Sequence, residues 1–592
     1  MDGPSGPAAS RGIPKYRARD LTPVADVDVD VEEILSVTNI FSDLVMVFVV
    51  LDVVALVILL FLERCDPRVF VTWMVLMFLL PPVGFILYLY MGATHYNRRK
   101  FLPKNVTDTQ MMEAAEWQRV QLESDLEAFQ DRPDLYHVAK SMEKAGAWSY
   151  SNSNDIQLYT EGGPFFSDMM EDIRGARKSV LIEYYIIRND HDGNEFMKLL
   201  TEKVREGVEV RLLTDAFGIG KGPKDGIFRF INAGGHYATF HSSLNLMLSP
   251  KKSNRNHRKI ALIDGRVAYC GGFNIGDEYR GQGPLGHWRD ASVKVEGPGV
   301  LPMLIRFCAD WQYCAGKDPL KDMQSYLDPE VFVHGGRDRM HLVSGGPDTM
   351  PNNPVQMQYL SMIVNARRRL YITTPYLSPD DSMMVALANA ARSGVDVRIL
   401  IPDKKDHIFL YWNNLTCANE LMKSGVRVYR YNDGFIHEKM ILMDEDCCSV
   451  GSANLDHRSL TLNFETNVMM YSRRINRQAC DQFLADLERS TEYSCAEFDA
   501  RTTMMKVRMA ISWQMKLLAR STTSRSWGPA PPAPPRRWPW RGAGCPWRSS
   551  SAWRTGPTPA TTRYAGRRSA TGCSRGSAGR PRPSWSGWTG YR

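Results

Sequence analysis

The chain of 592 residues lacks the patterns that define disulfide-rich and metal-binding proteins. It has eleven cysteines, an odd number, and no two of them form a Cys-x-x-C pair. Small secreted domains are held together by cysteines in even numbers, so we expect reduced thiols in a cytoplasmic setting. No group of His, Cys, Asp and Glu has the spacing of a metal site. The sequence therefore predicts neither a disulfide framework nor a metal ion or other cofactor.

Acidic residues are missing from the C-terminal end. Between Lys516 and Arg592 there are fifteen Lys and Arg and no Asp or Glu, whereas the whole chain carries a net charge of +8. The rest of the chain therefore carries −7, and the basic character belongs to the tail. Half of the fourteen Trp also fall there, without the period of a helix or strand, so we expect disorder over 521–592. Such a tail either binds anionic lipid or is a GC-rich reading frame after a frameshift, and we favour the frameshift.

A short string occurs twice in the sequence. Each copy reads His-x-Lys, then four apolar residues, then Asp; seven residues past the Asp begins a small-residue turn that ends in Asn. Two copies with the same apolar spacer and the same downstream turn are not a coincidence of composition. The candidate catalytic residues are His257, Lys259 and Asp264 in the first copy and His437, Lys439 and Asp444 in the second, and the turns are 271–274 and 451–454.

The spacing has a physical meaning. Residues two apart on an extended strand point to the same face, so the imidazole and the ammonium of each copy project together. The apolar run 260–263 continues as a buried strand, and Asp264 with Gly265 makes the turn out of it. The next strand brings the turn back beside the His, where glycines let a phosphate approach the backbone and Asn274 donates to a phosphoryl oxygen. The second copy repeats this arrangement with Ser452 and Asn454 in its turn.

Two imidazoles suit a reaction in which one attacks phosphorus while the other protonates the leaving alcohol. Each ring then needs a partner that sets its tautomer. The candidates are Asp290 and Glu465, which stand about thirty residues past the His of their own half. The alternative, in which each His is a satisfied core residue and each Lys a solvated edge, fits one copy but not the pair.

The repeat extends beyond the motifs. Strand-like segments 177–182 and 207–213 match 367–372 and 394–400, and a helical pattern lies between the members of each pair. A strand, a helix and a strand at this spacing indicate parallel βαβ units. We therefore expect an α/β fold of two homologous halves, 135–330 and 340–500, packed around one shared active site.

Two apolar runs lie near the N-terminus. Run 44–62 contains one acid, Asp52, and run 69–91 is interrupted by Pro81-Pro82. Both reach the length that spans a bilayer, so we expect a transmembrane helical hairpin within 40–92, with buried core helices as the alternative. Asp52 either faces the partner helix or marks a shallow insertion. The expected flanking segments are an N-terminal tail over 1–39, a linker helix over 93–134 with the basic cluster 97–100 on the cytoplasmic side, and a cationic helix over 501–520.

The two motifs resemble the signature of the phospholipase D superfamily, and further strings resemble bacterial cardiolipin synthase over about residues 40 to 500. The motifs point only to the superfamily; the flanking strings and the predicted hairpin point to the synthase. Synthases of this family end with a short cationic, apolar helix, and 508–518 is similar to its beginning. The strings are 182–186, 254–259, 271–279, 288–290, 402–407 and 451–459.

This resemblance implies phosphatidyl transfer between two phosphatidylglycerol molecules, giving cardiolipin and glycerol through a phosphohistidine, without a metal ion. It implies His257 as nucleophile and His437 as acid, although the near symmetry allows the reverse, with Lys259, Lys439, Asn274 and Asn454 holding the phosphate. The expected setting is the bacterial cell membrane, multi-pass, with catalytic halves in the cytoplasm, an anionic membrane as partner and no nucleic acid. The alternatives are a membrane-tethered hydrolase of lipid or nucleic acid and a non-catalytic membrane scaffold.

Overall fold

The computed structural model describes residues 31–58, 67–87, 125, 129, 132–144, 150–240, 254–315, 320, 323–349 and 353–520. The expected tail over 521–592 lies outside these residues, as do nearly all of the linker helix over 93–134 and most of the N-terminal tail.

The first half alternates strands and helices and then adds three antiparallel strands. Its strands are β1 (Tyr150–Glu161), β2 (Ser179–Tyr184), β3 (Glu209–Asp215), β4 (His236–Phe240), β5 (Ile260–Ile263), β6 (Val267–Gly271) and β7 (Trp288–Glu296). Its helices are α7 (Gly162–Gly175), α8 (His191–Arg205), α9 (Lys224–Asn232) and α10 (Val300–Ala315), with short 3₁₀ turns η4 (Gly218–Lys221) and η7 (Asp277–Arg280). The connection to the second half contains η8 (Met323–Tyr326) and η9 (Pro329–Phe332).

The second half repeats this order. Its strands are β8 (Asp338–Gly345), β9 (Arg369–Thr373), β10 (Asp396–Pro402), β11 (Arg427–Tyr431), β12 (Phe435–Ile436), β13 (Met440–Met443), β14 (Cys447–Gly451), β15 (Glu465–Tyr471) and β16 (Ser490–Tyr493). Its helices are α6 (Pro133–Lys144), which precedes the first half in sequence, α11 (Pro354–Asn365), α12 (Asp381–Arg392), α13 (Ile408–Met422), α14 (His457–Thr461), α15 (Arg473–Glu488), α16 (Cys495–Asp499) and α17 (Thr503–Arg520).

Strand pairing confirms the predicted βαβ units. β2 pairs in parallel with β3 across α8, and β9 pairs in parallel with β10 across α12. The motif strands add on antiparallel, β5 to β2 and β13 to β9. In the described residues one continuous sheet runs β16-β11-β10-β9-β13-β14-β15-β8-β1-β7-β6-β5-β2-β3-β4, with β12 paired to β7. The order is the same outward from the central β8 and β1, so the two halves are homologous and share one sheet.

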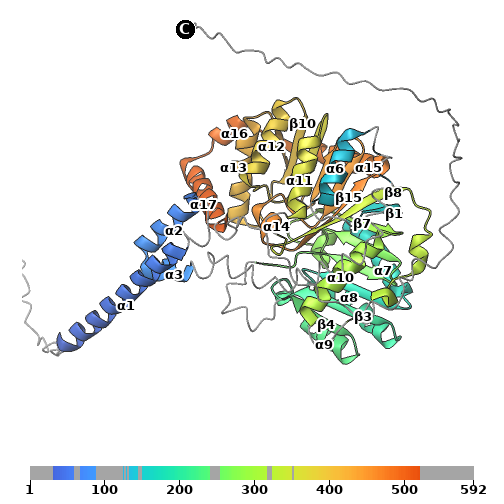
Figure 1. The fold of residues 1–592 in the computed structure, drawn as a ribbon, viewed down its shortest axis with the longest axis horizontal. Coiled ribbons are helices and arrows are strands. Elements are labelled where there is room, and N and C mark those ends of the chain that lie inside the picture. Colours follow the sequence, from blue (N-terminus) through green and yellow to red (C-terminus); the bar gives the residue numbers. More distant parts are fainter. Residues whose placement is uncertain are drawn as a thin grey trace, which may run out of the picture. The chain divides into compact units, whose positions relative to one another are not determined.

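Helices cover both faces of the sheet (Figure 1), because the side chains of each strand alternate between two buried faces. In β5, Ile260 and Leu262 point into one core, whereas Ala261 and Ile263 point into another, as a period of two requires. The first core also holds strand residues of the second half and is covered by α10 and α15. On the opposite face α7, α8 and α9 cover the first half, and α6, α11, α12 and α13 cover the second.

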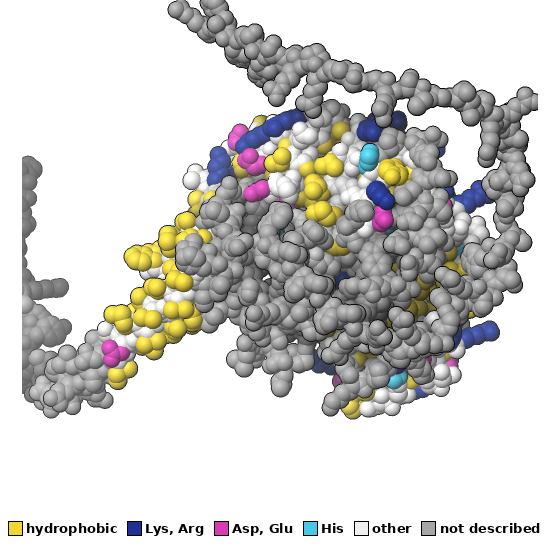
Figure 2. Space-filling model, viewed as in Figure 1, with side chains coloured by type: hydrophobic (Ala, Val, Ile, Leu, Met, Phe, Trp, Pro, Cys, Tyr) yellow, Lys and Arg dark blue, Asp and Glu magenta, His cyan; other side chains and the backbone are white. Residues whose placement is uncertain are grey.

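The N-terminal apolar runs are helical: α1 (Val31–Ile58), α2 (Pro67–Leu79) and α3 (Pro81–Leu87). The break between α2 and α3 falls at the Pro pair, because proline lacks the N–H that would continue a helix. Ala55, Trp73 and Met77 form a small shared core, and many neighbouring apolar side chains face outward (Figure 2). Among the described residues, no helix is both long enough and apolar enough to cross a membrane. The hairpin within 40–92 stays a prediction.

Candidate active site

The main chain of each motif His is held by a strand of the other half. Asn256 forms a parallel bridge with Phe464, and the His257 amide donates to the Phe464 carbonyl at 2.9 Å. In the other direction β12 pairs with β7, and the His437 amide donates to the Arg289 carbonyl at 2.7 Å. Each His therefore sits at the seam between the halves.

The two buried carboxylates orient the rings, but across the seam. His257 Nδ1 lies 2.9 Å from Glu465 Oε2, and His437 Nδ1 lies 2.7 Å from Asp290 Oδ2. The sequence named these two acids as candidates without assigning either to a ring, and the structure pairs each with the His of the other half. The cause is the exchanged strand pairing, because β15 and β7, which carry the acids, lie beside the His segments of the opposite halves. Neither half forms an oriented histidine alone.

The tautomer of His257 follows from its neighbours. Its Nδ1 faces the Glu465 carboxylate and, at 3.1 Å, the Ser452 carbonyl, and both of these groups only accept hydrogen bonds. Nδ1 therefore carries the proton and Nε2 has the free lone pair. Glu465 is itself held by the Ser452 hydroxyl at 2.5 Å and by the Asn463 amide at 3.0 Å.

The two motif lysines are buried beside the rings. Lys259 Nζ donates to the His257 carbonyl at 2.6 Å and lies 5.4 Å from the Tyr185 ring centre. Lys439 Nζ lies 2.6 Å from His437 Nδ1, which therefore faces a cation as well as a carboxylate. An anion placed between the rings would meet both ammonium groups.

Burial controls the protonation of the site. Desolvation lowers the pKa of His257 to about 4, of Lys259 to about 7 and of Lys439 to about 8, and it also lowers the pKa of His437. The charge of Lys439 acts on His257 and that of Lys259 acts on His437, so the two motifs share one electrostatic site.

The two orienting acids are ionised. Burial alone would raise the pKa of Glu465, but the charges and hydrogen bonds around it, His257 first among them, lower it below the ordinary value. Burial would likewise raise the pKa of Asp290, and Lys439 and His437 lower it. Ionised Glu465 accepts the Nδ1 proton of His257, whereas ionised Asp290 and the Lys439 ammonium both face Nδ1 of His437.

The two motif aspartates are not brought to the histidines. Asp264 stands at the far end of β5, where its carboxylate accepts the backbone amides of Arg177, Lys178 and Ser179 at 2.7–2.9 Å. Asp444 accepts the amides of residues 367–369 in the same way. Both have a positive φ, 52° and 49°, as the turn out of the strand requires. The prediction that Asp264 and Asp444 belong to the catalytic groups is therefore corrected: their carboxylates hold the start of β2 and of β9 in place.

The downstream turns place Asn274 and Asn454 near the site, but the side-chain amide of each bonds a residue nearby in the sequence. Asn274 Nδ2 donates to the Tyr279 hydroxyl at 3.1 Å, and Asn454 Nδ2 donates to the Ser459 hydroxyl at 3.3 Å. Each amide keeps a second N–H. The turns differ at one position: Gly272 stands where the second copy has Ser452, and a Cβ there would meet Asp290 Oδ1 at 1.9 Å.

Four aromatic residues flank the rings, and sequence reasoning gave them no role. The Tyr185 ring centre lies 5.0 Å from that of His257, and the centres of Trp288, Phe435 and Tyr376 lie 5.3, 6.1 and 6.4 Å from that of His437. Tyr185 and Trp288 lie in the strings shared with the synthases, whereas Phe435 and Tyr376 lie outside them and have no such signal in the sequence.

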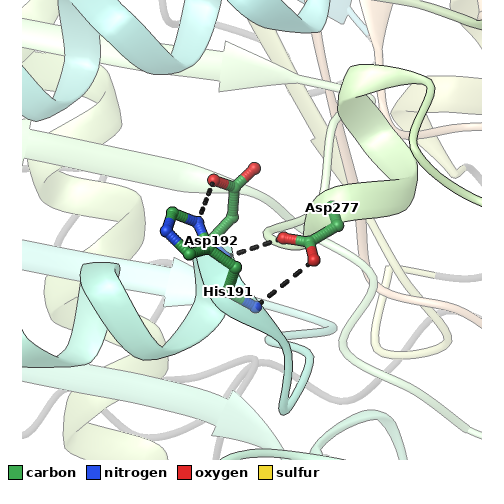
Figure 3. A group of neighbouring side chains, drawn as sticks. All are labelled: His191, Asp192 and Asp277. Carbon is green, nitrogen blue, oxygen red and sulfur yellow. Dashed lines mark hydrogen bonds and ion pairs between the residues drawn. The ribbon is translucent and has the colours of Figure 1, made fainter.

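One group of side chains has metal-ligand spacing among the described residues, namely His191, Asp192 and Asp277 (Figure 3). Asp277 accepts the backbone amides of His191 and Asp192 at 3.3 and 2.8 Å, and Asp192 pairs with Arg280 at 2.7 Å. These carboxylates are occupied in fastening the start of α8 to η7.

The fold and the geometry define a class of protein. Two homologous α/β halves bring to one seam an imidazole with a protonated Nδ1, a second imidazole backed by a carboxylate, and two lysines, an arrangement that suits the transfer enzymes that act on phosphodiesters.

Comparison with known proteins agrees. A family model described as "Cardiolipin synthase, PLD-like domain" matches residues 169–280 and 359–487. Cardiolipin synthase of Staphylococcus aureus (strain Mu50) is 35% identical over 464 residues, which is 77% of this chain and 92% of that protein. Cardiolipin synthase 1 of Staphylococcus epidermidis (strain ATCC 12228) is 34% identical over 486 residues, 80% of this chain and 97% of that protein.

A solved structure shows the same fold. The crystal structure of phosphatidylserine synthase from Haemophilus influenzae Rd KW20 matches 64% of this chain and 99% of its own, with a TM-score of 0.50 and 12% identity. The chain belongs to the cardiolipin synthase family, which is part of the phospholipase D superfamily. It is a phosphatidyltransferase of phospholipid biosynthesis.

Proposed function

We propose that the protein transfers a phosphatidyl group from one phosphatidylglycerol to the headgroup hydroxyl of another, giving cardiolipin and glycerol. The observation that carries this is the crossed pair of His–carboxylate hydrogen bonds, 2.9 Å for His257 and 2.7 Å for His437. These hydrogen bonds hold two imidazoles with different neighbours at the seam between the halves. A two-step transfer needs two such imidazoles, one as nucleophile and one as acid.

In the first step His257 Nε2 attacks phosphorus. The bond from phosphorus to the glycerol oxygen breaks, and that oxygen takes the Nε2 proton of His437, so glycerol leaves neutral. Lys259 and Lys439 face the phosphoryl oxygens and stabilise the charge that they gain in the transition state. Ionised Asp290 favours the imidazolium form of His437, and the bound anionic phosphodiester favours it further.

In the second step the direction reverses. The headgroup hydroxyl of a second phosphatidylglycerol loses its proton to His437, its oxygen attacks phosphorus, and the bond to His257 Nε2 breaks. His257 returns to the neutral form that Glu465 and Ser452 hold in place. Burial of the site limits the access of water to the reacting phosphorus, because the side chains of His257 and His437 are only 12% and 11% exposed.

The N-terminal helices attach the enzyme to the membrane that holds its substrates. In support, α1 to α3 expose large apolar side chains, among them Val50 and Val53 at 56% and Phe78 at 83%, and exposed apolar patches of this kind mark membrane or protein contacts. Asp52, by contrast, is buried, and neither of its oxygens bonds a described residue. A hairpin of two crossings with the basic cluster 97–100 after it places the catalytic halves in the cytoplasm of a bacterial cell.

The products test this function. Purified full-length protein in lipid vesicles is given phosphatidylglycerol with separate labels in the diacylglycerol part and in the headgroup glycerol. We expect labelled cardiolipin and one free glycerol for each cardiolipin. Phosphatidic acid plus glycerol in place of cardiolipin would make the protein a hydrolase, and absence of turnover in the wild type would favour a scaffold. His257→Ala is the matched negative control.

A further inference from the structure

The two sides of the active site have different charged neighbours. On the His257 side, burial and the charge of Asp215 raise the pKa of Tyr185, and the charges of Arg458 and Arg255 oppose that rise. The Arg255 guanidinium lies over the Phe217 ring at 4.8 Å. The neighbourhood of His257 therefore contains two arginines together with the carboxylates of Asp215 and Glu465.

On the His437 side the neighbouring group is a carboxylate. Tyr376 stands edge-on to His437 with ring centres 6.4 Å apart, and its hydroxyl donates to Asp406 Oδ2. The other carboxylate oxygen, Oδ1, accepts the backbone amide of His407 at 2.6 Å. Asp406 lies in the loop between β10 and α13, and its side chain is exposed.

Asp406 keeps unused hydrogen-bonding capacity next to the reacting groups. A carboxylate accepts about four hydrogen bonds, and the structure shows two on Asp406, from Tyr376 and His407. Its charge is also felt inside the site: burial lowers the pKa of Lys439, while the charges of Asp290, Glu465 and Asp406 oppose that fall. Asp406 is thus both open to solvent and within electrostatic reach of the lysine beside His437.

We propose that Asp406, held in place by Tyr376, is the binding site for the free hydroxyls of the glycerol headgroup. This rests on the proposed function, in which His437 protonates the leaving glycerol oxygen. The oxygens of the remaining hydroxyls of that glycerol lie three and four bonds from the reacting oxygen, on the His437 side. A hydroxyl donates and an ionised carboxylate only accepts, so the two are complementary.

The same position serves both steps. The glycerol that leaves and the glycerol headgroup that arrives present the same oxygen to His437, and microscopic reversibility places them in the same orientation. Asp406 is therefore a specificity residue for a polyol headgroup as donor and as acceptor, and Tyr376 is a positioning residue that acts through it.

The test compares two donors that differ only in headgroup hydroxyls: phosphatidylglycerol and phosphatidyl-1-propanol with the same acyl chains. Full-length protein is assayed for release of labelled glycerol or propanol. We expect Asp406→Asn to lower kcat/KM for phosphatidylglycerol by about 10- to 100-fold, the loss of a hydrogen bond to a charged group. Release of propanol should stay as in the wild type, since that headgroup has no hydroxyl left for Asp406.

Asp403→Asn is the matched control. Asp403 lies three residues earlier in the same loop and pairs with Arg430 at 2.9 Å, so its loss should leave the ratio of the two donors unchanged. Tyr376→Phe should lower the ratio in the same direction as Asp406→Asn but less. Equal losses for both donors in Asp406→Asn would assign it a structural role, and no loss for either donor would also overturn the proposal.

The donor ratio is read from released alcohol, whereas the proposed function is read from the lipid product. A wild type that yields phosphatidic acid would refute the synthase while leaving the headgroup subsite testable. A wild type that yields cardiolipin, with an Asp406→Asn ratio like its own, would refute the subsite alone.

Discussion

Replacing Asp264 should destabilise the protein without removing its chemistry. Its carboxylate accepts three backbone amides at the start of β2, from Arg177 at 2.8 Å, Lys178 at 2.7 Å and Ser179 at 2.9 Å. The groups are partly exposed, so each bond contributes about 1 kcal/mol, at the low end for a charged acceptor. Asp264 also has φ 52°, which costs a residue with a Cβ about 1 kcal/mol or more.

A series of three variants separates these two terms. Asp264→Asn keeps an oxygen acceptor and tolerates the left-handed backbone, so it should lose about 1 kcal/mol. Asp264→Gly loses all three bonds but relieves the strain that Asp264 carries, so it should lose about 2 kcal/mol. Asp264→Ala loses the bonds and keeps the same strain as the wild type, so it should lose about 3 kcal/mol.

The assay is thermal unfolding in detergent together with cardiolipin formation well below the unfolding midpoint. We expect midpoints in the order wild type, Asn, Gly, Ala, with turnover per folded molecule close to that of the wild type. His257→Ala is the converse control, with an unchanged midpoint and no turnover. A loss of turnover in Asp264→Asn without a change in midpoint would refute the structural role of this residue.

Three further outcomes follow from the site. Glu465→Gln should lower the rate of cardiolipin formation about 100-fold or more, since the tautomer of His257 is no longer fixed. Ser452→Ala should lower the same rate only about tenfold. Equal losses in the two variants would contradict this. Lys259 and Lys439 have pKa values of about 7 and 8 and lose their charge above them, so kcat/KM should fall as pH rises through that range. Lys259→Arg should shift this fall to higher pH. A pH profile of kcat/KM that is the same in Lys259→Arg would contradict the role of the lysine charge. Exhaustive chelation should leave the rate unchanged, and loss that is restored by a divalent ion would reveal a missed ligand set.

Local features of the fold were predictable from the sequence. The apolar runs 260–263 and 440–443 form strands in which every side chain is buried, and Asp264 with Gly265 makes the turn that was expected of them. These features depend on residues a few positions apart, where strand alternation and backbone sterics decide the structure. The repeated order of strands followed from the same local signals taken twice.

The partners across the seam were not predictable. Glu465 is 208 residues from the His that it orients, and Asp290 is 147 residues from its own. Spacing along the chain does not assign an acid to a ring, because it carries no information about which strands of the two halves become neighbours. The same limit explains Asp264: a fixed spacing from His257 shows that the residue matters to the motif, but not whether it serves the reaction or the strand.

The most direct measurement of the central claim is chemical identification of the covalent intermediate. Full-length protein is mixed with phosphatidylglycerol labelled at phosphorus, quenched in base within one turnover and digested for peptide mapping. The account predicts an acid-labile phosphatidyl group on the peptide that contains His257, and none on the peptide that contains His437. Label on His437, or cardiolipin formation with no labelled histidine at any time, would contradict it.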